Sequence, residues 1–345
     1  MRLLVRPWAW WHNKVPLSVI LVVLLADGGR FTFGVFAALV LVVVAVCAVG
    51  NYGYALNDLY DVDEDARAGR ANAVTAAGPA GMRLISALSA LCALLAATAA
   101  AGAIAGALTL VELALPAAYS IPPLRIKERR WLGVASDALA AHVYPAVLAL
   151  LAAAHWSLRP VPPVLWCAAL AWSLAAGLRG ILSHQLHTAE RDAGAGLATV
   201  VHAAGARRLE RVVVIVLLPV EVAAFAVALF CCDAGPVLWA GVLAYLAYEA
   251  YKTVSGTARG FTFRPQGQRY LPFLEESFYK VWGPLVLPLD AACADLAYLV
   301  LAPVYALLFR AHLAVELARI RALVVSARSP RAPATEPGDR SSAGS

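Results

Sequence analysis

Four long stretches that contain no charged residue constrain this chain more than any other feature. They cover residues 31–57, 84–111, 138–158 and 160–178. Each provides the roughly 20 helical residues that are needed to cross the hydrocarbon core of a bilayer. Soluble domains are about 25% charged, whereas this chain is 14% charged and 61% hydrophobic. We therefore predict an all-α polytopic membrane protein, because helices satisfy their own backbone polar groups in lipid.

Shorter apolar stretches bring the predicted number of transmembrane helices to about nine. They cover residues 15–26, 113–124, 212–220, 222–232 and 234–248. The C-terminal stretch 281–309 is interrupted by Asp290 and Asp295, and a hairpin there would give ten spans. We predict one integral-membrane domain over residues 1–327. Residues 328–345 are rich in Pro, Ser and Gly, a composition that favours a disordered tail.

Basic residues mark one side of the predicted membrane domain. Lys and Arg gather near the N-terminus and in alternate loops, whereas Arg30 and Arg159 alone occupy the opposite loops. The basic loops cover residues 67–83, 125–130, 179–211 and 252–280. Such loops lie on the cytoplasmic side of membranes, so the net charge of +6 needs no nucleic-acid partner. We expect a multi-pass protein of the cell membrane whose polar loops, and any chemistry they carry, face the cytoplasm.

The strongest motif ends the first long uncharged stretch and reads N-D-L-Y-D-V-D-E-D from Asn57 to Asp65. Asn57, Asp61 and Asp65 are four residues apart, so a helix places them on one face. Asp58 lies on an adjoining stripe. Like charges at such spacing repel one another, and at the membrane edge they are more unfavourable still. A bound divalent cation removes both penalties, and oxygen ligands favour Mg²⁺. The alternative is a solvated acidic loop.

A second polar segment, H-Q-L-H-T-A-E-R-D, runs from His184 to Asp192. Glu190 and Asp192 supply carboxylates beside His187. Two histidines three residues apart could bind zinc, but hydrogen bonding within a polar pocket is the commoner use of such residues. Two helix ends that each bind a metal ion could hold one diphosphate between them. The first motif therefore strengthens the interpretation of this segment as a second metal site.

A third segment, Y-S-I-P-P-L-R-I-K-E-R-R, runs from Tyr119 to Arg130. Its prolines end a predicted span and stiffen the loop that follows. Arg125 and Lys127 then direct cations at the same membrane face. A leaving diphosphate needs such donors, with Arg as a bidentate clamp and Lys as a point charge. Alternatively, the loop is a positive-inside anchor.

Together these three segments resemble the UbiA superfamily of intramembrane prenyltransferases. The matching patterns are Asn57-x3-Asp61-x3-Asp65, Tyr119-Ser120-x-Pro122-Pro123-x-Arg125-x-Lys127 and Glu190-x-Asp192-x3-Gly196-x2-Thr199. The resemblance covers roughly residues 6–290. It implies nine helices around a central, lipid-open cavity, with Mg²⁺ and a prenyl diphosphate held by two aspartate-rich motifs. The second motif of the family is usually Asp-x3-Asp, whereas Thr188 stands here at the first position, so one metal ligand is either missing or replaced by Glu190 or His187.

The resemblance and the residue chemistry together define an expected site. The expected metal ligands are Asp58, Asp61, Asp65, Glu190 and Asp192. The residues expected to act in catalysis are Asp61, Asp65, Asp192, Tyr119 and Lys127. The residues expected to bind substrate are Asn57, Arg67, Arg70, Arg125, Asp137, Arg179, His187 and Glu190. Alternatives stay open for four of the substrate-binding positions. Arg67 and Arg70 could be plain membrane anchors, Asp137 could make a helix–helix hydrogen bond, and Arg179 could extend its charge to the membrane surface, although a diphosphate contact is favoured for it.

These expectations converge on a Mg²⁺-dependent enzyme that ionises a prenyl diphosphate and transfers the prenyl group to a small acceptor. A terpene cyclase of the same family is the close alternative, in which the cation is quenched within its own chain. The altered second motif makes that alternative more credible. A transporter is less favoured, because the acidic residues lie at one face of the membrane and not at its midplane.

Overall fold

The computed structural model describes residues 7–26, 29–67, 69–156, 158, 160–194, 199–254, 274 and 277–328. Within those ranges only the backbone is described for residues 7–13, 190–194, 253–254 and 326–328. The predicted C-terminal tail falls almost wholly outside the described residues. Every regular element among the described residues is helical, which confirms the predicted all-α class.

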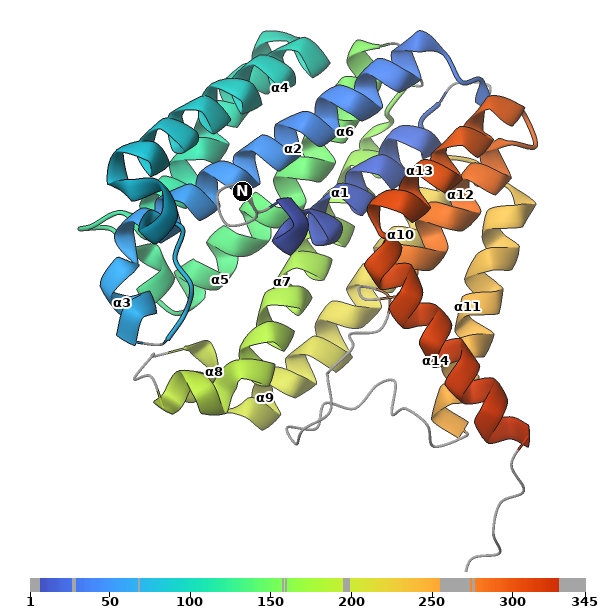
Figure 1. Cartoon of the computed structure of the whole chain (residues 1–345). Coiled ribbons are helices and arrows are strands. Elements are labelled where there is room, and N and C mark those ends of the chain that lie inside the picture. Colours follow the sequence, from blue (N-terminus) through green and yellow to red (C-terminus); the bar gives the residue numbers. More distant parts are fainter. Residues whose placement is uncertain are drawn as a thin grey trace, which may run out of the picture.

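The helices pack side by side in one membrane-type bundle (Figure 1). They are α1 (Pro7–Leu24), α2 (Phe33–Tyr60), α3 (Val62–Arg67), α4 (Val74–Ser120), α5 (Trp131–Ala138), α6 (Tyr144–His155), α7 (Pro163–Gly194), α8 (Val200–Ala204), α9 (Ala206–Arg211), α10 (Leu218–Cys231), α11 (Pro236–Val254), α12 (Gly283–Ala291), α13 (Leu301–Leu308) and α14 (Arg310–Arg328). Short π-helical or 3₁₀ segments occupy Ile126–Glu128, Leu139–Val143, Val212–Leu217, Phe278–Trp282 and Leu296–Val300.

Helix α4 is a hairpin of two helices. Ala101 and Gly102 leave the helical conformation, and Gly102 has a φ of 74° that suits glycine. A Cβ on Gly106 would lie 2.5 Å from the Thr98 hydroxyl oxygen. In a straight helix, residues eight apart are about 12 Å apart along the axis. The chain therefore turns back at Gly102, and small residues let the two halves pack closely.

The described part of the chain contains five helices long and apolar enough to cross a membrane, or six if one bent pair counts as a span. The five are Phe33–Tyr60, Val74–Ser120, Trp131–His155, Pro163–Ala189 and Ala206–Cys231, and the bent pair is Leu296–Leu308 with Arg310–Val325. Helix α4 is counted once although it is broken at Gly102. A multi-pass membrane protein is thus supported, whereas the predicted count of nine or ten spans is not confirmed.

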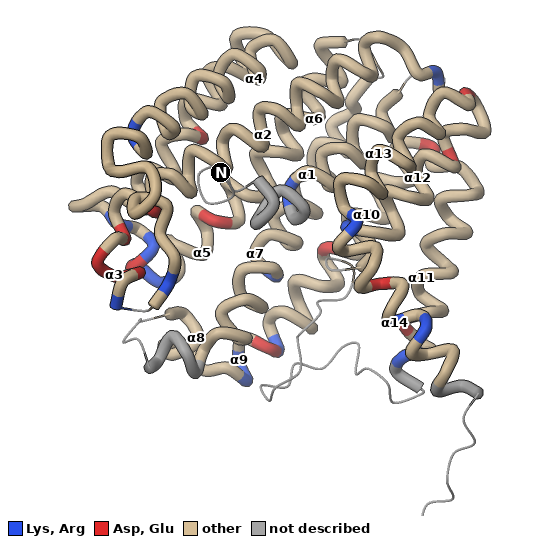
Figure 2. The backbone as a smooth tube through the Cα atoms, viewed as in Figure 1, with Lys and Arg blue, Asp and Glu red and all other residues tan. Residues whose placement is uncertain are grey.

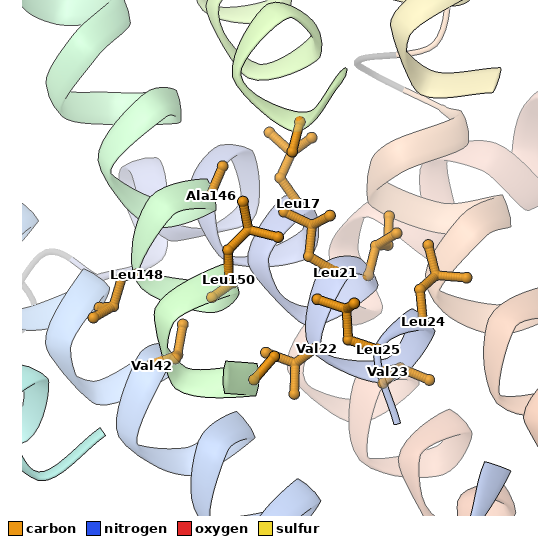
Figure 3. Close-up of a cluster of buried hydrophobic side chains, with 14 of the residues drawn as sticks. Leu17, Leu21, Val22, Val23, Leu24, Leu25, Val42, Ala146, Leu148 and Leu150 are labelled. Carbon is orange, nitrogen blue, oxygen red and sulfur yellow. The ribbon is translucent and has the colours of Figure 1, made fainter. Parts of the chain in front are cut away.

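Helix α1 forms the centre of the hydrophobic core. Leu21, Val22 and Leu25 have no solvent-exposed surface, and they pack against the helices that carry Val42 and Leu150 (Figure 3). The outer surface is apolar as well. Along α4, exposed leucines follow at helical spacing at positions 84, 88, 91 and 95. Such a contiguous apolar face suits contact with lipid rather than water.

Charged residues concentrate at one edge of the bundle (Figure 2). Helix α3, the helix pair α8–α9 and α14 lie along this edge, whereas the long helices between them are nearly free of charge (Figure 2). The acidic motif at the end of α2 lies at this edge. The fold therefore places the polar chemistry at one end of an apolar bundle.

Candidate active site

The chain breaks at Asp61, in the middle of the first acidic motif. Helix α2 ends at Tyr60, Asp61 is its C-cap, and α3 begins at Val62. The Asp61 amide donates to the carbonyl of Asn57 (2.9 Å), and the Asp65 amide donates to that of Asp61 (2.8 Å). The four-residue spacing is thus realised as successive turns across a break. Helix α3 therefore carries Asp63, Glu64 and Asp65, whereas Asn57 and Asp58 belong to α2, so the motif does not lie on one continuous helix.

Lys127 and Arg125 converge on the first motif from the loop after α4. The Lys127 ammonium lies 2.5 Å from both carboxylate oxygens of Asp61, and Arg125 lies 3.5 Å from the same carboxylate. Glu64 joins them, 3.2 Å from Arg125 and 3.6 Å from Lys127. Arg125 has a φ of 32°, which is unfavourable for a non-glycine residue. We call Asp61, Glu64, Arg125 and Lys127 the mouth cluster.

Burial governs the protonation of Asp61. The residue is 7% exposed, and desolvation raises its pKa above the ordinary value of an aspartate. The hydrogen bonds and charge of Lys127, together with the charge of Arg125, oppose that rise in pKa without cancelling it. The surroundings of Asp61 in the mouth cluster therefore favour either protonation of its carboxylate or the binding of a further cation to it.

Asp58 and Asp65 are tied to the start of α4 by Asn72. The Asn72 side-chain amide donates to the Asp58 carbonyl (2.9 Å) and to the Asp65 carboxylate (2.8 Å). The Asp58 carboxylate is buried and accepts from the Ala73 amide at 3.3 Å. The Asp58 carboxylate thus contacts the backbone at the start of α4, and its predicted role as a metal ligand stays a prediction. No local spacing in the sequence marks Asn72, and its role was not predicted.

The two arginines that follow the motif lie near the surface. Arg70 approaches the Asp65 carboxylate at 4.0 Å. Arg67 is exposed and donates to the Asp63 carbonyl at 3.2 Å. Arg70 is thus within reach of the acidic motif, whereas Arg67 makes a local contact within α3.

A cavity of about 220 Å³ begins one helical turn before Asp61 and extends into the apolar bundle. Asn57 and Ser120 form its end nearest the mouth cluster, and the Ser120 hydroxyl donates to the Asn57 side-chain oxygen (3.0 Å). The walls combine small and apolar residues with polar ones. The polar lining residues further include Lys14, Tyr54, Glu112, Tyr119, Ser136, Asp137 and Tyr144.

The donor set suits a hard cation that is shared with an anionic ligand. No group of three or more His, Cys, Asp or Glu side chains converges within the described residues. Mg²⁺, however, is usually held by one or two carboxylates together with waters and phosphate oxygens. Asp61 and Asp65, each near the mouth, offer such oxygens without the His or Cys of a zinc site.

The family model described as the UbiA prenyltransferase family matches residues 15–260 of the chain. The chain belongs to this family. Membership indicates an intramembrane enzyme that uses a prenyl diphosphate. No match was found among curated proteins.

Solved structures of a UbiA homologue from Archaeoglobus fulgidus share the fold. The form bound to GPP and Mg²⁺ is 19% identical, with a TM-score of 0.58, and the match covers 87% of this chain and 98% of that one. The form bound to DMAPP and Mg²⁺ is 21% identical, with a TM-score of 0.57 and the same coverage. A form bound to Cd²⁺ is 18% identical, with a TM-score of 0.53 over 88% and 98% of the two chains.

In this UbiA family member the second motif lies at the end of α7. That end reaches the same edge of the bundle as α3, beside α8 (Figure 1). The Thr188 hydroxyl is buried and donates to the His184 carbonyl within the helix (3.1 Å). His187 is exposed. The side chains of Glu190 and Asp192 lie outside the described residues, so their predicted roles as metal ligands stay predictions.

Arg179 occupies a buried ion pair rather than the cavity wall. Its guanidinium donates to both carboxylate oxygens of Glu221, at 2.5 and 2.8 Å. The Tyr279 hydroxyl also donates to Glu221 (3.0 Å), and the Trp172 indole donates to Tyr279 (2.8 Å). We call these four residues the interior network. The predicted contact between Arg179 and a diphosphate stays a prediction, and this geometry does not favour it.

Glu112 is one of the cavity residues that were not predicted from the sequence. It is 3% exposed, and no side chain or backbone group of the described residues makes a hydrogen bond with its Oε1. A signal was present, because Glu112 is the single charged residue between positions 84 and 124, and an ionisable residue within a span is a functional candidate by default. Asp137 lines the same cavity. Tyr119 and Asn57 line it too, whereas Lys127 and Arg125 belong to the mouth cluster.

Proposed function

We propose that this UbiA family member ionises a prenyl diphosphate with the help of Mg²⁺ and transfers the prenyl group to a small acceptor. The observation that carries the proposal is the mouth cluster beside one end of a cavity in an apolar bundle. The arrangement matches a substrate with an anionic head and an apolar tail. The binding of GPP and DMAPP with Mg²⁺ by the Archaeoglobus fulgidus homologue supports the same substrate class.

The diphosphate of the substrate would take the place of the Asp61 and Glu64 carboxylates as the partner of Lys127 and Arg125. Lys127 and Arg125 are held by Asp61 and Glu64 within 2.5–3.6 Å. They already face the place where a diphosphate would enter. Arg can clamp two phosphate oxygens at once, and Lys supplies a mobile point charge. Both would stabilise the negative charge that builds on the leaving diphosphate as its bond to carbon breaks.

Asp61 and Asp65 are the described residues that would hold Mg²⁺, and Asp192 and Glu190 would complete the site from α7. The ion would neutralise charge on the leaving group. Asn57 and Ser120 separate this polar mouth from the deeper cavity. Their mutual hydrogen bond positions the Asn57 amide at the boundary.

The cavity would hold the prenyl chain and exclude water from the cation. Burial of each methylene contributes about 0.8 kcal/mol. The rings of Tyr119 and Tyr144 line the cavity, and aromatic faces stabilise cations. Exclusion of water prevents hydrolysis before the acceptor reacts.

Transfer is favoured over cyclisation by the polar residues of the cavity. A prenyl chain that cyclises needs a cavity with apolar walls. Here Glu112, Asp137 and Lys14 line the cavity beyond the mouth. Such groups suit a second substrate with polar atoms. A membrane terpene cyclase is the second candidate, since Thr188 replaces an expected acid in the second motif.

The charge distribution supports a mouth that faces the cytoplasm. Lys and Arg concentrate at the edge of the bundle that carries the mouth cluster (Figure 2), and basic loops favour the cytoplasmic side. The cell membrane, with the cavity entered from the cytoplasm, is therefore the proposed location.

Product analysis tests the proposal. Purified protein with Mg²⁺ and GPP, and then C15 and C20 diphosphates, is assayed for diphosphate release and for organic products, with and without membrane extract as acceptor source. We expect prenylated product only when extract is present. Cyclic hydrocarbon or alcohol from the donor alone would favour the cyclase, and no release under any condition would refute both candidates.

A matched pair of variants identifies the site in the same assay. Asp61→Asn should lower the rate of release about 100-fold or more. Asp63→Asn makes the same change two residues away on an exposed side chain and should leave release unchanged.

A further inference from the structure

The two cations of the mouth cluster contact more carboxylates than their charge requires. Lys127 and Arg125 approach Asp61 at 2.5 and 3.5 Å, and they approach Glu64 at 3.6 and 3.2 Å. Glu128 adds a third carboxylate, 2.7 Å from Nε of Arg125. A multiply charged anion can bind to these cations only if a carboxylate moves away, because like charges in close contact repel one another.

Of the two carboxylates that contact both cations, Glu64 is held less firmly. Both oxygens of Asp61 lie 2.5 Å from the Lys127 ammonium, and the Asp61 side chain is 10% exposed. The Glu64 side chain is 30% exposed, and its shortest contact is the 3.2 Å ion pair with Arg125. The charges of Glu64 and Asp61 also repel one another. Glu64 can therefore leave more easily than Asp61, because water solvates a partly exposed carboxylate.

The backbone that carries the two cations is fixed by packing and does not depend on Glu64. A Cβ on Gly133 would lie 3.1 Å from the Lys127 carbonyl oxygen and 3.2 Å from the Lys127 Cα. The loop after α4 thus rests directly on the start of α5, where only glycine leaves enough space. Movement of Glu64 would therefore leave Lys127 and Arg125 near their present positions, with their donors available to an anion.

We propose that Glu64 is a displaceable counter-ion, which the diphosphate of the donor displaces from Arg125 and Lys127 and which returns when inorganic pyrophosphate leaves. In the empty site Glu64 reduces the repulsion between the two cations. In the occupied site it competes with the bound anion, so it weakens the binding of the pyrophosphate product and favours its release. This inference rests on the proposed function, since it concerns the leaving group at the same site.

Calorimetric titration of the purified full-length protein with inorganic pyrophosphate tests the competition. Glu64→Gln keeps the shape of the side chain without its charge, and we expect it to bind pyrophosphate about tenfold more tightly than the parent. Asp63→Asn removes the same charge from an exposed neighbour outside the mouth cluster, and its affinity should stay within about twofold of the parent because solvent screens that charge. Unchanged or weaker binding by Glu64→Gln would overturn the inference.

Two further arms of the titration separate competition from other roles of Glu64. With EDTA in place of Mg²⁺, Glu64→Gln should still bind more tightly than the parent, because Glu64 competes for the cations. Binding that is weakened only when Mg²⁺ is present would make Glu64 a metal ligand and contradict the proposal. Glu64→Asp keeps the charge and should bind as the parent does. If Glu64→Asp binds as tightly as Glu64→Gln, the charge is not the cause and the proposal fails.

The same titrations distinguish a failure of this inference from a failure of the proposed function. Lys127→Met should bind pyrophosphate more weakly than the parent, because it loses one of the two cations. If Lys127→Met loses affinity but Glu64→Gln gains none, the mouth binds diphosphate and this inference alone fails. If the parent binds no pyrophosphate with or without Mg²⁺, the proposed function and this inference fail together.

Discussion

The mouth cluster and the interior network are built from the same chemical groups in opposite surroundings. At the mouth, the side chains of Arg125 and Lys127 are 22% and 14% exposed. In the interior, Arg179 and Glu221 are 2% and 0% exposed and lie between α7 and α10. Each set joins basic side chains to carboxylates at hydrogen-bond distance. Solvent access is the property that distinguishes them.

This difference decides which partners can be exchanged. Removing one member of a buried ion pair leaves the other charge desolvated and uncompensated. The interior network must therefore stay intact, and the hydroxyl of Tyr279 adds a further donor to Glu221. At the mouth, water and incoming phosphate oxygens can take over from the carboxylates. The ion pair of the interior network is thus a permanent structural contact, which we call the clamp. The ion pairs of the mouth cluster can be replaced by other ligands.

The largest effect is expected from breaking the interior network. Arg179→Met leaves the Glu221 carboxylate buried without its cation, so we expect the free energy of unfolding to fall by about 3–5 kcal/mol. Thermal unfolding of the purified protein in detergent measures this. The double variant Arg179→Met with Glu221→Leu removes both charges and should recover most of the loss. A single variant as stable as the parent would show that the pair is not a clamp.

Asp61→Asn should reverse the pattern, with a large effect on activity and little on stability. Loss of the central carboxylate of the mouth cluster should lower the rate of diphosphate release about 100-fold or more, as for other lost electrostatic contacts to a transition state. The melting temperature should change little, because Lys127 and Arg125 retain Glu64. An Asp61→Asn protein that is strongly destabilised would place Asp61 with the clamp residues.

The contrast between the mouth cluster and the interior network could not be predicted from the sequence, although the all-α membrane class could. Uncharged stretches specify membrane helices through composition alone, and the spacing of Asn57, Asp61 and Asp65 is local. The pairing of Arg179 with Glu221 depends on which two helices pack together. No pattern within residues 160–232 contains that information. The sequence therefore predicted three polar segments and a diphosphate contact for Arg179, but not the pairing of Arg179 with Glu221.

The break at Asp61 was missed for a related reason. Four-residue spacing predicts one helix face, yet the acidic run is interrupted where Asn72 and the loop after α4 contact it. Glu112 differs, because its isolation in an apolar stretch was visible. Its meaning became clear only when the structure placed it on the cavity shared with Asp137 and Tyr119.

Lys127→Met should give a smaller loss of activity than Asp61→Asn. Arg125 remains to hold the phosphate oxygens, so we expect diphosphate release to fall about tenfold, as for loss of one charge-assisted hydrogen bond. Because the mouth cluster is partly exposed, the remaining activity should also decline with rising salt concentration. We expect no such salt dependence for the interior network, because it is buried. The thermal stability that Arg179 provides should be nearly independent of salt. An equal salt response in the two assays would remove the distinction.

The smallest effect concerns the pH dependence of stability. Burial raises the pKa of Asp61 above its ordinary value of 3.8, so the folded protein keeps this proton to a higher pH than the unfolded chain. As pH rises from about 3.8 through the raised pKa, the parent should therefore lose stability relative to Asp61→Asn, and the difference should then level off. Melting temperatures of both proteins between pH 4 and 7 measure it.

The same experiment on Lys127→Met distinguishes burial from pairing. Lys127 lowers the pKa of Asp61 against the rise caused by desolvation. Without the ammonium the pKa should rise further, so the interval over which stability falls should extend to higher pH. If instead the parent gains stability relative to Asp61→Asn as pH rises, pairing with Lys127 outweighs desolvation. The mouth carboxylate would then be held as firmly by its cation as Glu221 is by Arg179, and the contrast between the two networks would lie in their exposure alone.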